Sequence, residues 1–248
     1  MTDEMLAMYE GITTTRAIRR FQYEVDIPDA VLAKMFYAAT RAPSGNNSQP
    51  FRFIVLRRTP GAAEARKLLG VAFRSRWQRK SADEGYQEGS GNGASPAPVT
   101  PKERLAQAID EFVENVERAP LIVLPCLVPS SGTLPGLPSS ELARGANVYP
   151  ACQNLLLAAR SLGFGGAMTM WHRPAGDLLG SVLGVPSEVF IAATLVLGKP
   201  VGSHGPVRRR PLQDLVFENR WGEGAEWAID PPGTRFAGGP PKPAVTSA

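Results

Sequence analysis

The segment of residues 42–56 most constrains the fold, because a helix, a turn and a strand must follow one another within it. Its first half, residues 43–48, consists of turn-forming residues, and its second half, residues 51–56, is an apolar and β-branched run. We predict a helix that ends before Pro43, a polar turn and then a strand. Such a turn leaves several backbone N–H groups free to meet a ligand, or it is an ordinary connecting loop.

The composition indicates a globular protein. The chain has 248 residues, of which 43% are hydrophobic and 20% are charged. This length suits one large domain or two small ones. No apolar run approaches the roughly 20 residues of a membrane span. The acidic N-terminus lacks the basic-then-apolar order of a signal peptide, so we expect a cytoplasmic protein that does not bind membranes.

The charge pattern favours a small anionic ligand over nucleic acid. The formal net charge is only +4. The arginines form short clusters: Arg16, Arg19 and Arg20; Arg74, Arg76 and Arg79; and Arg208, Arg209 and Arg210. Short clusters suit a phosphate-bearing small molecule, and no aromatic residues alternate with them as in nucleic-acid-binding surfaces. We therefore expect no nucleic-acid partner.

Metal and hydrolase chemistry have little support in the sequence. The two histidines, His172 and His204, are too few for a histidine-based metal site, and no G-x-S-x-G motif is present. Cys126 and Cys152 lie in apolar surroundings without a C-x-x-C partner, so we interpret them as buried structural thiols. We predict no metal site and assign no catalytic residue.

The pattern of apolar residues predicts an alternation of helices and strands. Helices are expected over residues 3–10 (interrupted at Gly11), 26–40, 60–79, 102–119, 141–162 and 174–183, and strands over residues 51–56, 121–128 and 190–198. Pro125 implies a bulge or an edge in its strand. Pro150 should kink its helix or mark the true start, and Gly163 should end it.

Residues 13–21, T-T-T-R-A-I-R-R-F, are interpreted as a helical turn. Arg16 and Arg19 would then project from one face and could clamp a phosphate through their guanidinium groups. Solvated surface arginines are the alternative. Two further segments are rich in Gly and Pro. Residues 81–101 are a flexible loop or a lid over a site, and residues 222–248 are a C-terminal extension that wraps over the domain or a partner subunit or stays disordered.

An ordered set of segments resembles the FMN-dependent nitroreductase family. The segments are T-R-A-I-R-R-F (15–21), A-P-S-G-N-N-S-Q-P-F-R-F-I-V (42–55), Q-N-L-L-L-A-A-R-S-L-G-F-G (153–165), and I-A-A-T-L-V-L-G-K-P (191–200) followed by R-R-R-P-L (208–212). The likeness spans residues 11–218. It implies an α+β fold with a central mixed or antiparallel sheet flanked by helices, an FMN-binding domain over residues 1–221, and an intertwined homodimer with FMN at the subunit interface.

The resemblance also implies which residues meet the cofactor. Arg16, Ala17 and Arg19 correspond to the segment that holds the FMN phosphate and ribityl chain, although the family usually has Ser where Ala17 stands. Ser44, Gly45 and Asn47 correspond to a turn contributed by the other subunit. Met168, Thr169 and Met170 should lie along the isoalloxazine ring. Arg209 should also meet the phosphate, with Arg208 and Arg210 as alternatives.

The resemblance implies an NAD(P)H-dependent flavin oxidoreductase. Hydride would pass from NADPH or NADH through FMN to a nitroaromatic or quinone acceptor by a ping-pong mechanism. The residue chemistry agrees with FMN, because the chain offers arginines for the phosphate, small polar residues for the ribityl chain and a Gly/Met/Trp segment for the ring. The alternatives are a reductive dehalogenase, for which Glu84, Tyr86 and Lys102 are candidate lid residues, a flavin-cleaving enzyme, or a non-catalytic flavin-binding protein.

Overall fold

The computed structural model describes residues 8–83, 100–128 and 145–236, which belong to two compact units. The described part of the first unit lies within residues 17–203. The described part of the second unit combines residues 8–16 with residues 204–236.

The first unit alternates helices with strands. Its α-helices are α2 (Asp29–Ala39), α3 (Ala63–Asp83), α4 (Pro101–Asn115), α6 (Tyr149–Ser161) and α7 (Gly176–Val182). Its strands are β1 (Phe51–Leu56), β2 (Leu121–Leu127), β3 (Gly165–Thr169), β4 (Phe190–Ile191) and β5 (Thr194–Gly198). Short 3-10 helices occur at η1 (Gly45–Asn47), η2 (Pro60–Ala62), η3 (Val116–Arg118) and η4 (Arg173–Ala175).

The five strands form one antiparallel sheet in the order β1-β2-β5-β3, with β4 paired to β2. The predicted α+β class is confirmed, and every pairing in the described sheet is antiparallel. Pro125 lies on β2 between the residues paired with β5 and those paired with β4. The missing N–H of proline therefore falls where β2 changes partner, which agrees with the predicted irregularity.

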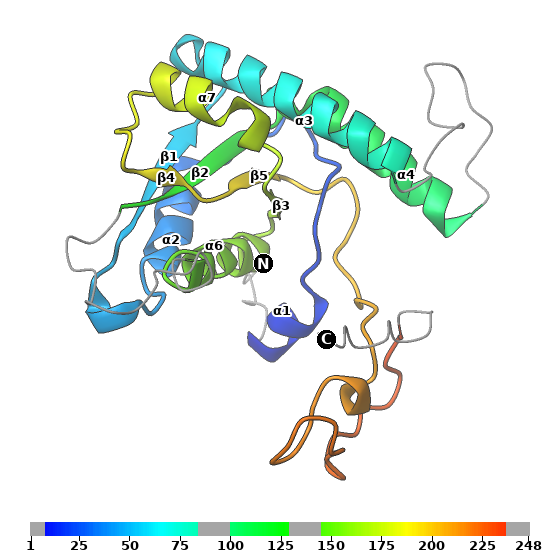
Figure 1. Cartoon of the computed structure of the whole chain (residues 1–248). Helices are drawn as coiled ribbons and strands as arrows, with labels where there is room; N and C mark the ends of the chain where they lie inside the picture. The colour runs from blue at the N-terminus through cyan, green and yellow to red at the C-terminus, as the bar shows by residue number, and fades with distance from the viewer. Residues whose placement is uncertain (1–7, 84–99, 129–144, 237–248) are drawn as a thin grey trace. The chain divides into compact units, whose positions relative to one another are not determined.

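Helices cover both faces of the sheet (Figure 1). On β2, Ile122, Leu124 and Cys126 pack into a core with α3 and α4. The alternate residues Leu121, Val123 and Leu127 pack into a second core with α2 and α6. Successive side chains of a strand point to opposite faces, so a strand that is apolar throughout serves both cores.

Most predicted boundaries in the first unit hold. Pro150 marks the true start of α6, and the helix ends at Gly163, which has a φ of 79°. The Phe164 N–H donates to the Ala159 carbonyl at 2.8 Å, which closes a Schellman motif. The predicted strand over residues 190–198 is interrupted at Ala192 and Ala193, so β4 and β5 are separate.

Two predictions near the N-terminus are wrong. Gly11 does not interrupt a helix but lies inside α1 (Met8–Thr14). Residues 15–20 are not helical. The hydroxyls of Thr14 and Thr15 donate to carbonyls four residues earlier, and the helix ends there. Farther along, the Ile18 N–H donates to the Gly166 carbonyl at 2.9 Å. The backbone here satisfies its polar groups by pairing with the edge strand β3 instead of continuing the helix.

The second unit has little buried apolar surface. It contains α1 and one 3-10 turn, η5 (Leu212–Asp214), and is held by contacts such as the bond from the Leu212 N–H to Asp230 Oδ2 at 3.0 Å. Several large apolar side chains are exposed, and Trp221 is 86% exposed. The described part of this unit therefore has no hydrophobic core of its own.

Gly70 in α3 provides a test of the packing between α3 and η3. A Cβ at this position would lie 2.6 Å from Cγ and Cδ of Glu117, whose carboxylate is 2.7 Å from Arg74. We expect Gly70→Ala to destabilise the protein by about 1–3 kcal/mol, because the clash outweighs the better helix propensity of Ala. Urea denaturation measures the effect.

The control is Gly61→Ala, where a Cβ meets no atom within 4 Å. Combining Gly70→Ala with Glu117→Ala should recover part of the loss, since it removes the side chain in the way. A Gly70→Ala protein as stable as the parent would show that Glu117 moves aside without cost.

Candidate functional site

The outer edge of β3 gathers five of the predicted site residues. The hydrogen bond from Ile18 to Gly166 places Ala17 and Arg19 alongside β3. Met168 and Thr169 are the last residues of this strand, and Met170 follows them. Ala17 is exposed, and Met168 is 40% exposed, so this edge offers an apolar side chain beside an arginine.

Arg19 is unusual among the arginines of the first unit. It is partly buried, and desolvation lowers the pKa of its guanidinium. No described residue forms a hydrogen bond or ion pair with its side chain, whereas the adjacent Arg20 pairs with Glu111 at 2.6 Å. A partly desolvated cation without a counterion stabilises a nearby anion strongly. Arg19 therefore fits a ligand that carries negative charge.

Four N–H groups of the turn before β1 have acceptors, and those of Ser44 and Asn46 have none among the described residues, so the expectation of free N–H groups holds only in part. The Gly45 N–H donates to Asn147 Oδ1 at 2.8 Å, and the Gln49 N–H donates to Ser44 Oγ at 2.9 Å. The N–H groups of Asn47 and Ser48 donate to carbonyls within the turn, each at 3.0 Å. Small polar residues thus supply most of the bonds that hold the turn. The hydroxyl of Ser44 accepts one of them and keeps its own proton to donate to a ligand.

The same turn contains backbone strain. Asn46, Asn47 and Gln49 have φ values of 52°, 52° and 46°, in the left-handed region. Asn tolerates this conformation, but for Gln it is uncommon and costs free energy. Strain of this kind persists where the surrounding structure enforces it, and it clusters at functional sites.

Within one protomer, the turn and the β3 edge lie at the same end of the sheet but on opposite sides. β1 begins at this end and β3 finishes there, with β2 and β5 between them. Three strand spacings separate β1 from β3, or about 14 Å. The structure thus does not bring Ser44, Gly45 and Asn47 next to Arg19.

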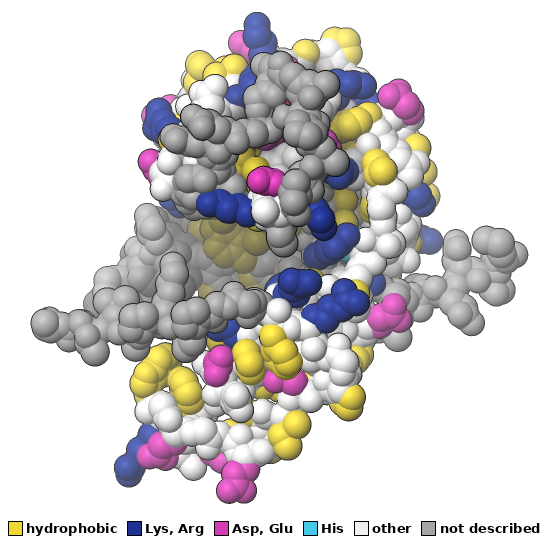
Figure 2. Space-filling model, turned by 90° about the vertical axis from the view of Figure 1, so that its right-hand side faces the viewer, with side chains coloured by type: hydrophobic (Ala, Val, Ile, Leu, Met, Phe, Trp, Pro, Cys, Tyr) yellow, Lys and Arg dark blue, Asp and Glu magenta, His cyan; other side chains and the backbone are white. Residues whose placement is uncertain are grey.

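Arg16, Arg208 and Arg209 belong to the second unit. All three are exposed, and the Arg209 backbone N–H donates to the Arg235 carbonyl at 3.3 Å. Since residues 15–20 are extended, Arg16 does not share a helix face with Arg19. On the face drawn in Figure 2, Lys and Arg side chains occur in small groups among acidic, hydrophobic and neutral ones.

Trp171 is the tryptophan of the Gly/Met/Trp segment that the sequence analysis offered for the flavin ring, but no role in packing was predicted for it. It directly follows Met170, and its ring stacks on Trp77 of α3 with centroids 6.2 Å apart and planes at 19°. Phe73 contacts it edge-on at 5.8 Å. These contacts anchor the end of β3 to α3. The sequence shows a tryptophan next to the Met-Thr-Met segment, but it does not show that its stacking partner is Trp77, because that residue lies 94 positions earlier.

The cysteines behave as predicted. Cys126 and Cys152 are buried free thiols. Burial raises the pKa of Cys126 to about 11 and that of Cys152 to about 12, so neither forms a thiolate at neutral pH. Among the described residues, no three His, Cys, Asp or Glu side chains lie together as a metal site would require.

The proposed lid falls mostly outside the described residues. Residues 84–99, including Glu84 and Tyr86, are not among them, while Lys102 is an exposed residue of α4. No helix among the described residues has the length and apolar character to span a membrane.

His172 is buried, with 2% of its surface exposed, and its Nε2 lies 3.0 Å from the Ile191 carbonyl. Desolvation lowers its pKa, the hydrogen bond to Ile191 raises it, and Arg173 lowers it; the net direction is downward. The unfolded chain then binds the proton more readily, so stability is full above pH 6.5 and falls as the pH drops below that value.

We expect this residue to change the free energy of unfolding by up to about 1.4 kcal/mol per pH unit below pH 6.5. His172→Gln should remove it, because Gln keeps an amide for the Ile191 carbonyl and does not titrate. Urea denaturation of both proteins between pH 5.5 and pH 8 measures the difference. Parallel curves would mean that His172 does not carry the acid sensitivity.

Comparisons with known proteins agree with the resemblance. A model described as the Nitroreductase family matches residues 12–199. An NADH dehydrogenase from Thermus thermophilus is 26% identical over 206 residues, which cover 82% of this chain and 91% of that protein. A putative NADH dehydrogenase/NAD(P)H nitroreductase from Methanothermobacter thermautotrophicus is 24% identical over 199 residues, which cover 79% of this chain and 78% of that protein.

Solved structures show the same fold. An NADPH:FMN oxidoreductase from Vibrio harveyi, complexed with NAD+, has a TM-score of 0.61 at 21% identity, covering 87% of this chain and 78% of that one. A BluB-like flavoprotein from Clostridium difficile has a TM-score of 0.61 at 20% identity, and the match covers 87% of this chain and 100% of that one.

Proposed function

We propose a function from one established premise: the chain belongs to the Nitroreductase family, whose model matches residues 12–199. It is an NAD(P)H-dependent oxidoreductase with FMN as its cofactor. When bound, FMN supplies the redox chemistry, taking hydride from NADPH or NADH and passing the electrons to a nitroaromatic or quinone acceptor in a ping-pong exchange.

The observation that carries the assignment is Arg19 beside β3, which is partly buried and has no counterion among the described residues. The residues at this edge fit FMN, because Arg19 offers positive charge to its electron-rich groups and Met168–Met170 offer an apolar surface to its ring. Ala17 contributes backbone only. We propose that Arg16 and Arg209, with Arg208 or Arg210 as alternatives, hold the phosphate, since a guanidinium can donate two hydrogen bonds to it.

We also propose a homodimer in which the turn at Ser44, Gly45 and Asn47 serves the FMN of the partner subunit. This arrangement is supported by the separation of the turn from the β3 edge within one protomer. It is further supported by exposed apolar side chains of the second unit, namely Met8, Tyr9, Trp221, Trp227 and Ile229, which a partner would cover. Sedimentation should give twice the 26.6 kDa of one chain.

A spectrum of the purified protein tests the central assignment. We expect flavin absorption bands, either as purified or after incubation with FMN, and bleaching of these bands on anaerobic mixing with NADPH or NADH. Later addition of a nitroaromatic or a quinone should restore them. A protein that never acquires the bands would contradict FMN binding.

The same experiment separates the alternatives. Bands that NAD(P)H does not bleach favour a non-catalytic flavin-binding protein. A flavin-cleaving enzyme would lose the bands irreversibly under oxygen. A reductive dehalogenase would release halide from a halogenated amino acid but leave nitroaromatics unreduced. The cytoplasmic location stays a prediction.

A further inference from the structure

A pocket of about 650 Å³ lies between α7 and the chain that leads into β4. One wall is α7, and the other is apolar, formed by Val185, Val189 and Phe190. His172, Arg173, Asp177 and two serines add polar groups. Its size is that of sites that hold small organic molecules.

Two glycines open the α7 wall. Gly176 and Gly180 are four residues apart, so they lie on one face of the helix, and both line the pocket. A Cβ at either position would meet no atom within 4 Å. Their φ values are not in the left-handed region. Neither packing nor backbone conformation therefore requires glycine, although glycine disfavours a helix. The two glycines therefore keep this face of α7 open to the pocket.

The buried imidazole of His172 lacks one hydrogen bond. A carbonyl only accepts, so Nε2 must carry the hydrogen that is donated to Ile191, and Nδ1 is left as an acceptor. Nδ1 is shielded from solvent and has no partner among the described residues. Buried acceptors without donors are rare and cost free energy. The carboxylate of Asp177 is a second acceptor in the same pocket.

We propose that this pocket binds a small aromatic molecule that donates an N–H or O–H to Nδ1 of His172. Arg173 contributes a cation to the same lining, whereas the acceptors of His172 and Asp177 suit a ligand that donates a hydrogen bond. The wall of Val185, Val189 and Phe190 selects an apolar ring. The open face of α7 leaves room for the ring. The site is independent of the proposed flavin function, because none of its residues belongs to the predicted cofactor set.

Indole and 1-methylindole are matched probes, since methylation removes the single donor and keeps the ring. The purified protein, labelled with 15N in histidine, is titrated with each at pH 8. His172→Gln assigns the signals, because the chain has only two histidines. We expect indole to shift the Nδ1 resonance of His172 upfield, and 1-methylindole to bind about tenfold more weakly without that shift. Equal binding of the two probes would overturn the proposal.

Filling the pocket gives a second test. Gly180→Leu should reduce the affinity for indole at least tenfold. Gly180→Ala should reduce it less, while the melting temperature stays constant or rises because alanine favours the helix. Gly61→Ala is the control, since its Cβ also meets nothing but lies outside the pocket. Unchanged affinity in Gly180→Leu, or an equal loss in Gly61→Ala, would refute the site.

Discussion

Replacing Arg19 with Gln is expected to lower the affinity for FMN by about 10- to 100-fold, the range for losing a charge-assisted hydrogen bond. Arg19 is partly buried and faces no acidic partner among the described residues, so bound FMN would supply the missing negative charge. Fluorescence titration of the apoprotein with FMN measures the effect without relying on turnover.

The same substitution should not destabilise the apoprotein, and its melting temperature is expected to stay constant or rise. Removing a desolvated cation without a counterion relieves an unfavourable burial, as at other sites where function costs stability. Arg57→Gln is the matched control, because Arg57 forms a surface ion pair with Asp29 and is not a site residue. If both variants lose FMN equally, Arg19 has no specific role.

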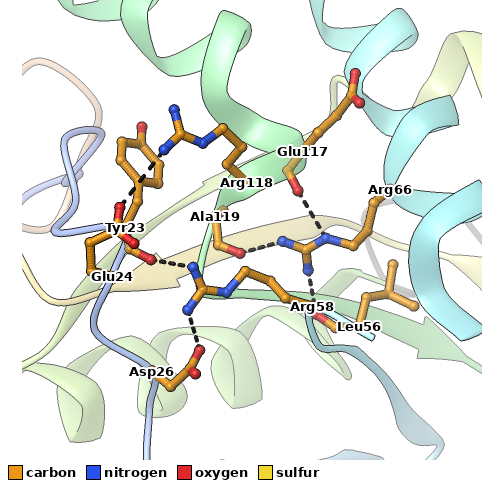
Figure 3. A network of polar contacts seen from close by, with 9 residues as sticks. All are labelled: Tyr23, Glu24, Asp26, Leu56, Arg58, Arg66, Glu117, Arg118 and Ala119. Atoms are coloured by element: carbon orange, nitrogen blue, oxygen red, sulfur yellow. Dashed lines mark hydrogen bonds and ion pairs between the residues drawn. The ribbon is translucent and has the colours of Figure 1, made fainter. Parts of the chain in front are cut away.

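Replacing Arg66 with Met is expected to lower the free energy of unfolding by about 3–5 kcal/mol, because buried backbone carbonyls would lose their hydrogen-bond donor. Arg66 is only 4% exposed, and its guanidinium donates to the carbonyls of Leu56, Glu117 and Ala119 (Figure 3). It thereby ties α3 to the end of β1 and the start of β2. Desolvation and Arg58 lower its pKa to about 10, against an opposing effect of Glu117, so it remains charged at pH 7.

Urea denaturation of Arg66→Met and of Arg57→Met measures the contrast. The Arg57 pair with Asp29 is exposed, so its loss should cost less than about 1 kcal/mol. Arg66→Lys should recover only part of the loss, since an ammonium cannot donate in three fixed directions to the three carbonyls. Similar losses for Arg66→Met and Arg57→Met would mean that the buried carbonyls find other partners.

Local patterns predicted most elements of the first unit but missed β3, whose glycine-rich sequence does not have the pattern of a strand. The strand over residues 51–56, the start of α6 at Pro150 and its end at Gly163 all follow from short-range rules, because turns and caps are set by neighbouring residues. The helical turn over residues 13–21 failed for the opposite reason. Its spacing fitted a helix, but the Ile18 backbone pairs with β3, more than a hundred residues away.

The sequence by itself determined the family, the α+β class and the kinds of group that suit FMN. Only the tertiary structure decided how the candidate residues are grouped: Arg19 lies on the same edge of the sheet as Met168 and Thr169, and the turn at Ser44 lies on the opposite side of the sheet. It alone also showed that Arg19 has no counterion among the described residues, while the guanidinium of Arg66 donates to three backbone carbonyls. Both residues are arginines, and their roles differ because contacts between segments far apart in the sequence decide which groups surround each guanidinium.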